Sequence, residues 1–276
     1  MLRAYSILAY LFLYGPIMLI VLFSFNSGLS AADFQGFSVK WYAKVAGNSL
    51  MLAALQTSMI VAFTSAALAT VMGTMAALAL QRVKGPVRLI FDGLTYIAIM
   101  VPGIVIGIAT LIALVTTFEA ANAVLATIWP GDAPLQLHMG YGSIIAAHTL
   151  FSMALVIVIV RARIAGMDRS LIEASMDLYA DPWATFRQVT LPQLMPAIMA
   201  GFLLCFTFSF DDFVIAFFVA GPLNTLPIYV FSSIRRGVTP EINAIGTVIL
   251  FSSFTLLILA QWLMRRRAVA AVPAKA

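Results

Sequence analysis

The amino-acid sequence predicts an all-α polytopic membrane protein with six transmembrane helices. Of its 276 residues, 62% are hydrophobic and only 10% are charged, whereas a soluble domain is roughly half apolar and about a quarter charged. Six apolar runs are long enough to cross a bilayer, since one crossing needs about 20 helical residues. They lie near 6–26, 52–80, 89–117, 141–161, 197–220 and 241–264. We expect residues 1–276 to form one transmembrane domain, with its core at 48–264.

The charged residues and the single cysteine argue against several other classes of protein. The net charge is +5, but the basic residues fall at the ends of the apolar runs and form no patch for nucleic acid. Cys205 lies inside an apolar run, so the chain has no internal disulfide and no cysteine cluster for a metal. The sequence also lacks a Gly-x4-Gly-Lys-Ser/Thr loop, so the chain cannot supply nucleotide chemistry itself.

The positions of lysine and arginine predict the orientation, because cytoplasmic loops carry an excess of both. With the N-terminus inside, 12 of the 16 basic residues lie on the inner side. The inner ones are Arg3, Arg82, Lys84, Arg88, Arg161, Arg163, Arg169, Arg187, Arg265, Arg266, Arg267 and Lys275, and the outer ones are Lys40, Lys44, Arg235 and Arg236. This distribution predicts that both termini and the segment 161–192 are cytoplasmic.

The first run, 6–26, is interpreted as an uncleaved helix. Its apolar part is longer than the roughly 7–15 residues of a signal-peptide core, although Ser30-Ala31-Ala32 would also permit cleavage. In the external loop 27–47, Ser38 predicts the start of a short interfacial helix. We expect Trp41 and Tyr42 on that helix to lie at the level of the lipid headgroups.

The second and third runs carry packing signals. The second is rich in residues that let helices approach closely in lipid. They are Ala53, Ala54, Ser58, Ala62, Ser65, Ala66, Ala69, Gly73 and Ala76. In the third run, Pro102-Gly103 predicts a helix kink, which suits a pathway wall and plain packing equally. We expect 118–140 to be an external loop with a turn at 129–134, a candidate surface for an external partner.

The stretch Gly140-Tyr141-Gly142-Ser143, followed by His148, raises the question of an intramembrane serine enzyme. Such an enzyme needs an activated serine and a histidine brought together in space. The order of residues is not that of a Gly-x-Ser-Gly motif. We therefore interpret His148 as a packed helix residue.

Two adjacent carboxylates interrupt the fifth run, in Ser209-Phe210-Asp211-Asp212. Each costs about 3 kcal/mol at mid-bilayer on insertion scales, so they should face a cavity, a cation or a partner. Small residues share the helix face of Asp212 (Gly201, Cys205, Ser209, Ala216 and Ala220) and bulkier ones that of Asp211 (Ala200, Leu204, Thr207, Phe208, Ile215 and Phe218). We expect Asp212 to face a substrate pathway with Ser209, and Asp211 to be secondary. The alternatives are a helix break capped by aspartate and pairing with Arg235 or Arg236.

After the fifth run, the external loop 221–240 contains a helix signal that begins at Pro227 and ends at Gly237. Thr239-Pro240-Glu241 then predicts the start of the sixth span.

The segment 161–192 is the longest charge-rich stretch and predicts two short helices. Asp168 is placed to cap the first and Asp181, followed by Pro182, to begin the second. Pro192 and Pro196 are expected to end the segment before the next span.

Residues 173–192 resemble the cytoplasmic loop of permease subunits of ABC-type importers. That loop reads Glu-Ala-Ala, three residues, Gly, nine residues, Ile, one residue, Leu-Pro. The identities are Glu173, Ala174, Leu191 and Pro192, and the departures are Ser175 for Ala, Tyr179 for Gly and Val189 for Ile. The family glycine makes a sharp turn that needs positive φ, which tyrosine adopts poorly. The resemblance implies that this loop, within 161–196, docks on an ATPase subunit and transmits its motion.

Residues 208–245 further resemble permease subunits of polyamine importers. The similarity lies in Asp211-Asp212, Gly221-Pro222, Leu226-Pro227, Gly237-Val238 and Pro240-Glu241-Ile242-Asn243, with looser similarity at Lys40-Trp41-Tyr42 and Asn48-Ser49-Leu50. The resemblance implies a type I importer permease of the inner membrane for putrescine or spermidine. It implies a second permease subunit in a heterodimer, two ATPase subunits that hold the ATP and magnesium, and an external substrate-binding protein.

Two other interpretations remain open. One is a permease of the same class for another amine or an amino-acid-like solute. The other is an ion-coupled secondary transporter, in which Asp211 and Asp212 would be ion sites; internal repeats with matching broken helices would favour it, and no second half-match to the Asp-Asp stretch is found.

Overall fold

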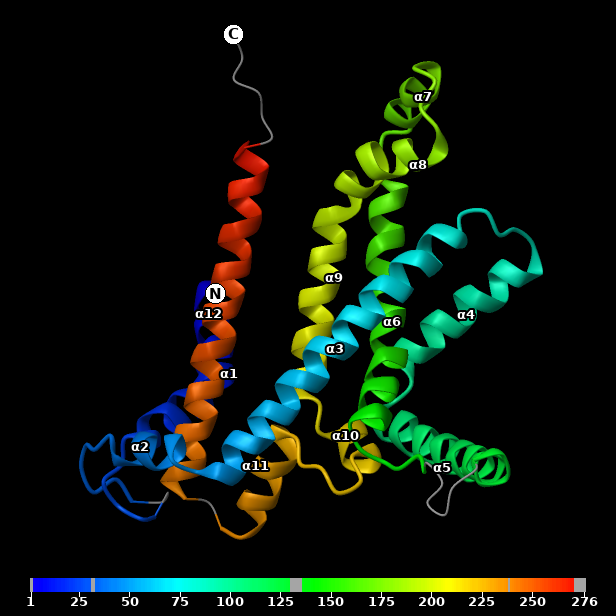
Figure 1. Cartoon of the computed structure of the whole chain (residues 1–276). Coiled ribbons are helices and arrows are strands. Elements are labelled where there is room, and N and C mark those ends of the chain that lie inside the picture. The colour runs from blue at the N-terminus through cyan, green and yellow to red at the C-terminus, as the bar shows by residue number, and fades with distance from the viewer. Residues whose placement is uncertain (1, 31–32, 130–135, 238, 271–276) are drawn as a thin grey trace. The chain divides into compact units, whose positions relative to one another are not determined.

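The computed structural model describes residues 2–30, 33–129, 136–237 and 239–270 (Figure 1). The described chain divides into a terminal unit, Met1–Ala53 with Tyr229–Ala276, and a central unit, Ala54–Ile228. Both units are built from helices; the described residues form no strand beyond one antiparallel bridge between Asn26 and Phe37. The helices are α1 (Leu2–Ser24), α2 (Lys40–Ala46), α3 (Ser49–Ala79), α4 (Pro86–Met100), α5 (Gly103–Ile128), α6 (Tyr141–Ala165), α7 (Ser170–Asp177), α8 (Pro182–Thr185), the π-helix η1 (Phe186–Thr190), α9 (Leu191–Asp211), α10 (Val214–Val219), α11 (Leu226–Arg235) and α12 (Pro240–Ala270).

In the terminal unit, α1 packs against α12, and α2 also contacts α12. A Cβ atom on Gly246 would lie 3.7 Å from Ile20, so the two long helices approach closely there. Lys44 Nζ lies 2.6 Å from Glu241 Oε2 and joins α2 to the first turn of α12. The predicted start of the sixth span is confirmed, because α12 begins at Pro240.

The loop between α1 and α2 is organised around Asn26, which is fully buried. The Asn26 amide donates to the carbonyl oxygens of Ser30 and Asp33, and the indole Nε1 of Trp41 donates to the Asn26 carbonyl oxygen over 2.6 Å. Trp41 is only 5% exposed. The N–H and the ring of Trp41 are therefore used inside the folded loop, and its position at the headgroup level stays a prediction.

The central unit is packed through the small residues of α3, as their composition predicted. Six of them are at most 2% exposed: Ala54, Ser58, Ala62, Ser65, Ala66 and Ala69. On α6, Val156 contacts Gly73 of α3 and Gly201 of α9; a Cβ atom on Gly73 would lie 2.7 Å from the Val156 Cβ. Three helices thus meet at Val156, where α6 packs on both α3 and α9.

The third predicted run is two helices rather than one kinked span. Helix α4 ends at Met100, Val101 and Pro102 adopt extended backbone with ψ of 132° and 136°, and α5 begins at Gly103. The residue before a proline avoids the α region, and proline lacks an N–H, so the break has a local cause. The expected loop at 118–140 is corrected as well, since α5 continues to Ile128. The predicted turn at 130–134 lies outside the described residues.

The fifth predicted run is also divided into two helices. The predicted boundary between the segment 161–192 and this run is not the end of a helix. Helix α8 continues through η1 into α9, with Pro192 in the first turn of α9 and Pro196 inside it. Pro192 and Pro196 therefore do not end the segment; proline is tolerated in a first turn, and the wider π-helical turn precedes it. Helix α9 then ends at Asp211, and α10 begins at Val214.

Five stretches of helix among the described residues are long and apolar enough to cross a membrane. They are Tyr5–Ser24, Ser49–Ala79, Gly103–Ile128, Tyr141–Ala165 and Pro182–Asp211. The sixth predicted span corresponds to α12, and the side chains of Arg265, Arg266, Arg267 and Lys275 lie outside the described part of the chain.

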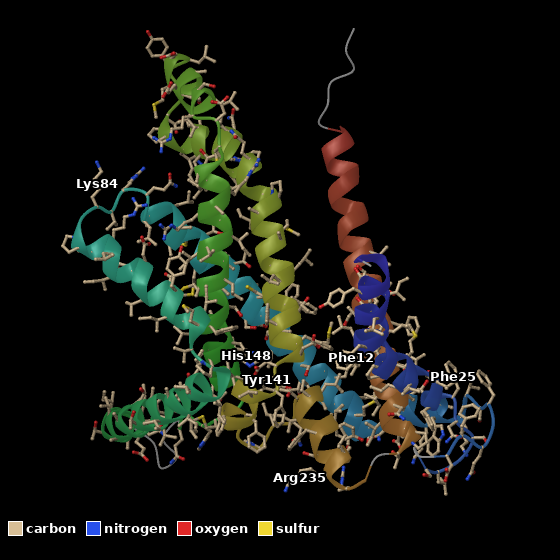
Figure 2. The ribbon with its side chains drawn as sticks, turned by 180° about the vertical axis from the view of Figure 1, so that it is seen from behind. Phe12, Phe25, Lys84, Tyr141, His148 and Arg235 are labelled. Atoms are coloured by element: carbon tan, nitrogen blue, oxygen red, sulfur yellow. The ribbon has the colours of Figure 1, made fainter. Side chains whose placement is uncertain are left out.

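Within the central unit, the charged connections gather at one end of the long helices. Helices α7 and α8 lie at one end of α6 and α9, and α5 and α10 lie at the other (Figure 1). The connection between α3 and α4, which carries Lys84, points toward the end of α7 (Figure 2). The basic residues predicted to be cytoplasmic in this unit therefore share one end.

Candidate functional site

Asp212 lies at the break between α9 and α10. Its backbone is extended, with φ −71° and ψ 121°, and its Oδ2 accepts a hydrogen bond from the Ala216 backbone N–H over 2.9 Å. The carboxylate thus satisfies one of the N–H groups left open at the start of α10. This is the capped helix break that the sequence left as an alternative.

His148 of α6 joins this break to two other helices. Its Nε2 lies 3.3 Å from Asp212 Oδ2, and its Nδ1 is hydrogen-bonded to Ser209 Oγ of α9 over 2.7 Å. Ser209 Oγ is in turn 2.9 Å from Ser65 Oγ of α3. His148 is 2% exposed and lies among the helices of the central unit (Figure 2). The four side chains form one polar chain that joins α3, α6 and α9 to the start of α10.

The two aspartates differ in burial. Asp212 is 22% exposed, and Cys205 and Ser209 on its face of α9 are buried. Asp211 is exposed, as are Leu204 and Phe208 on its face. Asp212 is therefore the carboxylate that faces the interior of the unit, and Asp211 is the outward one.

The serine that raised the enzyme question is not beside His148. Ser143 Oγ bonds the carbonyl oxygens of Gly140 and Val219, so it caps the start of α6 and ties it to α10. Ser209, which does contact His148, is 7% exposed, and its hydroxyl is also hydrogen-bonded to Ser65. No group of three or more His, Cys, Asp or Glu side chains that could hold a metal occurs within the described ranges.

The loop between α6 and α9 has the two short helices that the sequence predicts. Asp181 Oδ1 accepts hydrogen bonds from the Trp183 and Ala184 N–H groups and so begins α8. Asp168 Oδ1 accepts a hydrogen bond from the Ser170 N–H over 2.9 Å. Arg169 occupies the cap position of α7, so Asp168 lies one residue before the cap that the sequence predicted for it. That hydrogen bond, with the Ser170 hydroxyl, holds the pKa of Asp168 below its usual value.

The turn between α7 and α8 places Tyr179 at φ +58°, the positive φ that the family glycine would supply. The Ala180 N–H donates a hydrogen bond to the Ser175 carbonyl oxygen, and the Tyr179 N–H donates one to the Met176 carbonyl oxygen. This pair of bonds is the Schellman arrangement of a helix end. The tyrosine side chain is 98% exposed. Tyr179 therefore makes the sharp turn despite its side chain.

A hydrogen bond between Ser175 Oγ and Thr185 Oγ1, 3.0 Å apart, joins α7 to α8 across this turn. Ser175 stands where the family pattern has alanine, so this bond depends on one of the departures from that pattern. The remaining residues of the pattern are solvent-accessible: Glu173, Ala174 and Pro192 are exposed and Leu191 is partly buried. Trp183, 68% exposed, stacks on Phe186 with ring centroids 5.6 Å apart.

An ion pair that sequence reasoning missed joins α4 to α6. Arg161 bonds the Asp92 carboxylate through both guanidinium nitrogens, and Arg88 Nε lies 3.8 Å from the same carboxylate. An aspartate inside an apolar run was the available signal, since a carboxylate there needs a partner.

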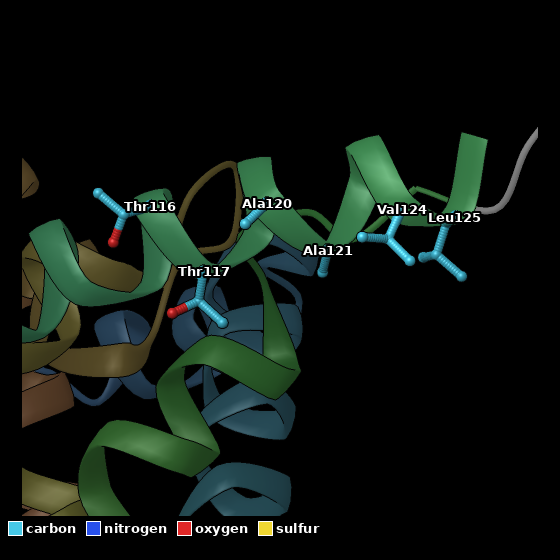
Figure 3. Close-up of a pocket in the computed structure, with 6 residues that line it drawn as sticks. All are labelled: Thr116, Thr117, Ala120, Ala121, Val124 and Leu125. Atoms are coloured by element: carbon cyan, nitrogen blue, oxygen red, sulfur yellow. The ribbon is translucent and has the colours of Figure 1, made fainter. Parts of the chain in front are cut away.

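The break before Gly103 leads into α5, which packs on α10. A shallow hollow on α5 is lined by Thr116, Thr117, Ala120, Ala121, Val124 and Leu125 (Figure 3). All six residues come from one helix, so the hollow is a surface feature of α5 and contains none of the polar chain around His148.

The sequence and the fold match one group of membrane proteins. Residues 69–267 match the family model described as "Binding-protein-dependent transport system inner membrane component". The chain is 38% identical over 267 residues to the putrescine transport system permease protein PotI of Escherichia coli K12, covering 94% of this chain and 89% of that protein. It is 34% identical over 257 residues to the spermidine/putrescine transport system permease protein PotC of the same strain, covering 93% and 90%.

A solved structure shares the fold. It is a bacterial alginate ABC transporter in complex with an alginate pentasaccharide-bound periplasmic protein, whose matched chain aligns with a TM-score of 0.71. The sequence identity is 15%, and the alignment covers 97% of this chain and 93% of that chain.

Proposed function

We propose, since this chain belongs to the family of binding-protein-dependent transport system inner membrane components, that it is the permease subunit of an ATP-driven importer for a small organic cation, putrescine or spermidine. The observation that carries the proposal is the similarity to PotI along 94% of the chain. Its relatives are permease proteins, and this chain is likewise a permease subunit and not an enzyme.

The acidic residue inside the central unit fits a cationic solute. Asp212 is partly exposed and is held at a break in a membrane-spanning helix. A carboxylate stabilises an ammonium group strongly where water is scarce. We assign Asp212 and Ser209 to the substrate pathway, with Asp211 as a secondary contact and the Pro102-Gly103 break as part of the pathway wall.

The proposed topology has six spans within one permease domain, 1–276, with both termini in the cytoplasm. The sixth span is α12, and the basic residues between α3 and α4 and around α7 mark the inner side. The inner membrane location agrees with the family description.

The loop 161–196 is the proposed contact with the ATPase. Its exposed residues include Glu173 and Trp183, and its connection to α9 is an unbroken helix, so a displacement of the loop would move α9. The partners of the proposed complex are a second permease subunit, two ATPase subunits that bind ATP and magnesium, and an external substrate-binding protein. No cofactor is assigned to this chain.

Two alternatives make different predictions. A permease for another amine or an amino-acid-like solute would keep the same partners, whereas an ion-coupled carrier would work without them. The test is ATP hydrolysis by the reconstituted complex with each candidate solute and its binding protein. We expect putrescine or spermidine to stimulate hydrolysis; stimulation only by an uncharged or anionic solute would contradict the proposal.

A further inference from the structure

The polar chain around Asp212 contains a residue that no transport role yet explains. His148 is buried, on a different helix from the two aspartates, and both of its ring nitrogens lie near polar atoms. A buried imidazole with two polar neighbours can be held in either the neutral or the protonated form, depending on what those neighbours can donate and accept.

In the neutral form all hydrogen bonds of the chain run in one direction. Ser65 donates to Ser209 Oγ and Ser209 donates to His148 Nδ1, at 2.9 and 2.7 Å. His148 Nε2 lies 3.3 Å from Asp212 Oδ2 but makes no hydrogen bond, and Oδ2 accepts the Ala216 N–H instead. Asp212 Oδ1 accepts no hydrogen bond from the residues that the structure describes.

In the protonated form the serines reverse. His148 Nδ1–H donates to Ser209 Oγ, and Ser209 donates to Ser65 Oγ. The Ser65 hydroxyl then donates a hydrogen bond to the Ala62 carbonyl oxygen, 3.4 Å away. The two serines and Nδ1 therefore keep their partners when the ring gains a proton, and the added charge lies beside the Asp212 carboxylate, 3.3 Å from Nε2.

We infer that His148 is a positioning residue that competes with the cationic solute for Asp212: beside the neutral ring the carboxylate is open to an ammonium group, and the protonated ring neutralises it. The inference rests on the proposed function, because it takes the solute to be a cation that passes Asp212. A positive charge beside the carboxylate removes the attraction that a second cation would feel.

The other titratable groups near His148 are set by the helices packed against α6. Helices α3 and α10 carry none among their residues. The titratable side chains on the other helices packed against α6 are Cys205 and Asp211 on α9, Glu119 on α5, and Arg88, Asp92 and Tyr96 on α4, and α6 itself carries Tyr141, Arg161 and Arg163. Imidazole is the side chain whose charge changes within the physiological pH range.

The experiment measures ATP-driven uptake of labelled putrescine into proteoliposomes that hold the full complex, with saturating loaded binding protein, across roughly pH 6 to 8. The ATPases and the binding protein are the same in every sample, so the ratio of wild-type to His148→Gln uptake isolates the residue. We expect that ratio to fall by about threefold or more from the alkaline to the acidic end. The matched control is His138→Gln, on the exposed second histidine, whose profile should follow that of the wild type.

A second variant keeps the test decisive if the glutamine variant does not assemble. Ser65→Ala removes the acceptor that only the protonated form needs, and alanine fits the small-residue face of α3. It should move the acidic loss of uptake to lower pH. An unchanged ratio for His148→Gln, or an unchanged midpoint for Ser65→Ala, overturns the inference while uptake itself persists. A wild-type complex that takes up neither polyamine at any pH overturns the proposed function and the inference together.

Discussion

Val156 on α6 and Gly73 on α3 are in such close contact that a Cβ atom on Gly73 would stand 2.7 Å from the Val156 Cβ. Gly73→Ala should therefore destabilise the protein by about 1–3 kcal/mol, the range for overpacking a close contact. The thermal unfolding midpoint of the purified complex in detergent checks this. Gly93→Ala is the control, because nothing lies within 4 Å of its added Cβ. Equal midpoints for the two variants would contradict the packing at Val156, and Val156→Gly, which removes that Cβ, should relieve part of the clash.

Asp212→Asn should reduce polyamine uptake by about tenfold or more, since a charge-assisted hydrogen bond to the solute would be lost. Assembly should persist, because the asparagine oxygen can still accept the Ala216 N–H. Uptake kinetics and co-purification of all subunits measure the two effects separately. Asp211→Asn, on the exposed neighbour, should have the smaller effect. Unchanged uptake by Asp212→Asn would remove this residue from the pathway.

Tyr179→Gly should stabilise the turn between α7 and α8. A non-glycine residue at positive φ costs about 1–2 kcal/mol, and glycine avoids this cost. Amide hydrogen exchange at Tyr179 and Ala180, whose N–H groups close the turn, should slow accordingly. Leu178→Gly is the matched control, because Leu178 has φ −82° and should lose stability instead. Faster exchange in Tyr179→Gly would show that the side chain, and not the backbone, holds the turn.

Glu173→Ala should weaken attachment of the ATPase subunit, by about tenfold if one charged hydrogen bond is lost. A pull-down of the ATPase with the affinity-tagged permease measures retention across a salt series. Asp177→Ala changes a second exposed carboxylate of α7 and serves as the control. Equal retention by the two variants would mean that Glu173 makes no specific contact.

The sequence predicted local features whose causes are local. The starts of α8 and α12 follow from Asp181-Pro182 and Thr239-Pro240, and the burial of α3 follows from its small residues. The start of α11 is placed within one residue of Pro227, and Gly237, after its end, has φ +124°. These signals depend on capping, proline geometry and residue size, which a short window of sequence contains.

Features that depend on distant contacts were missed. Pro102 marked the break before α5, but the packing of α5 on α10, where Gly107 lies against Phe218, gave no local signal. His148 gave no local sign of Asp212, because the two residues come together only when α6 packs on α9. The Asp92 pair with Arg161 likewise forms only when α4 meets α6. The residues of the candidate site were therefore partly predictable, and their connections were not.

Uptake of labelled putrescine into proteoliposomes under separate energy sources tests the central claim most directly. One set contains the assembled permease pair with ATPases, ATP and the loaded binding protein, and the other has an ion gradient without ATP or binding protein. Accumulation that requires ATP and the binding protein together is the expected result. Accumulation driven by the ion gradient alone would contradict the proposal that this chain is the permease of an ATP-driven polyamine importer.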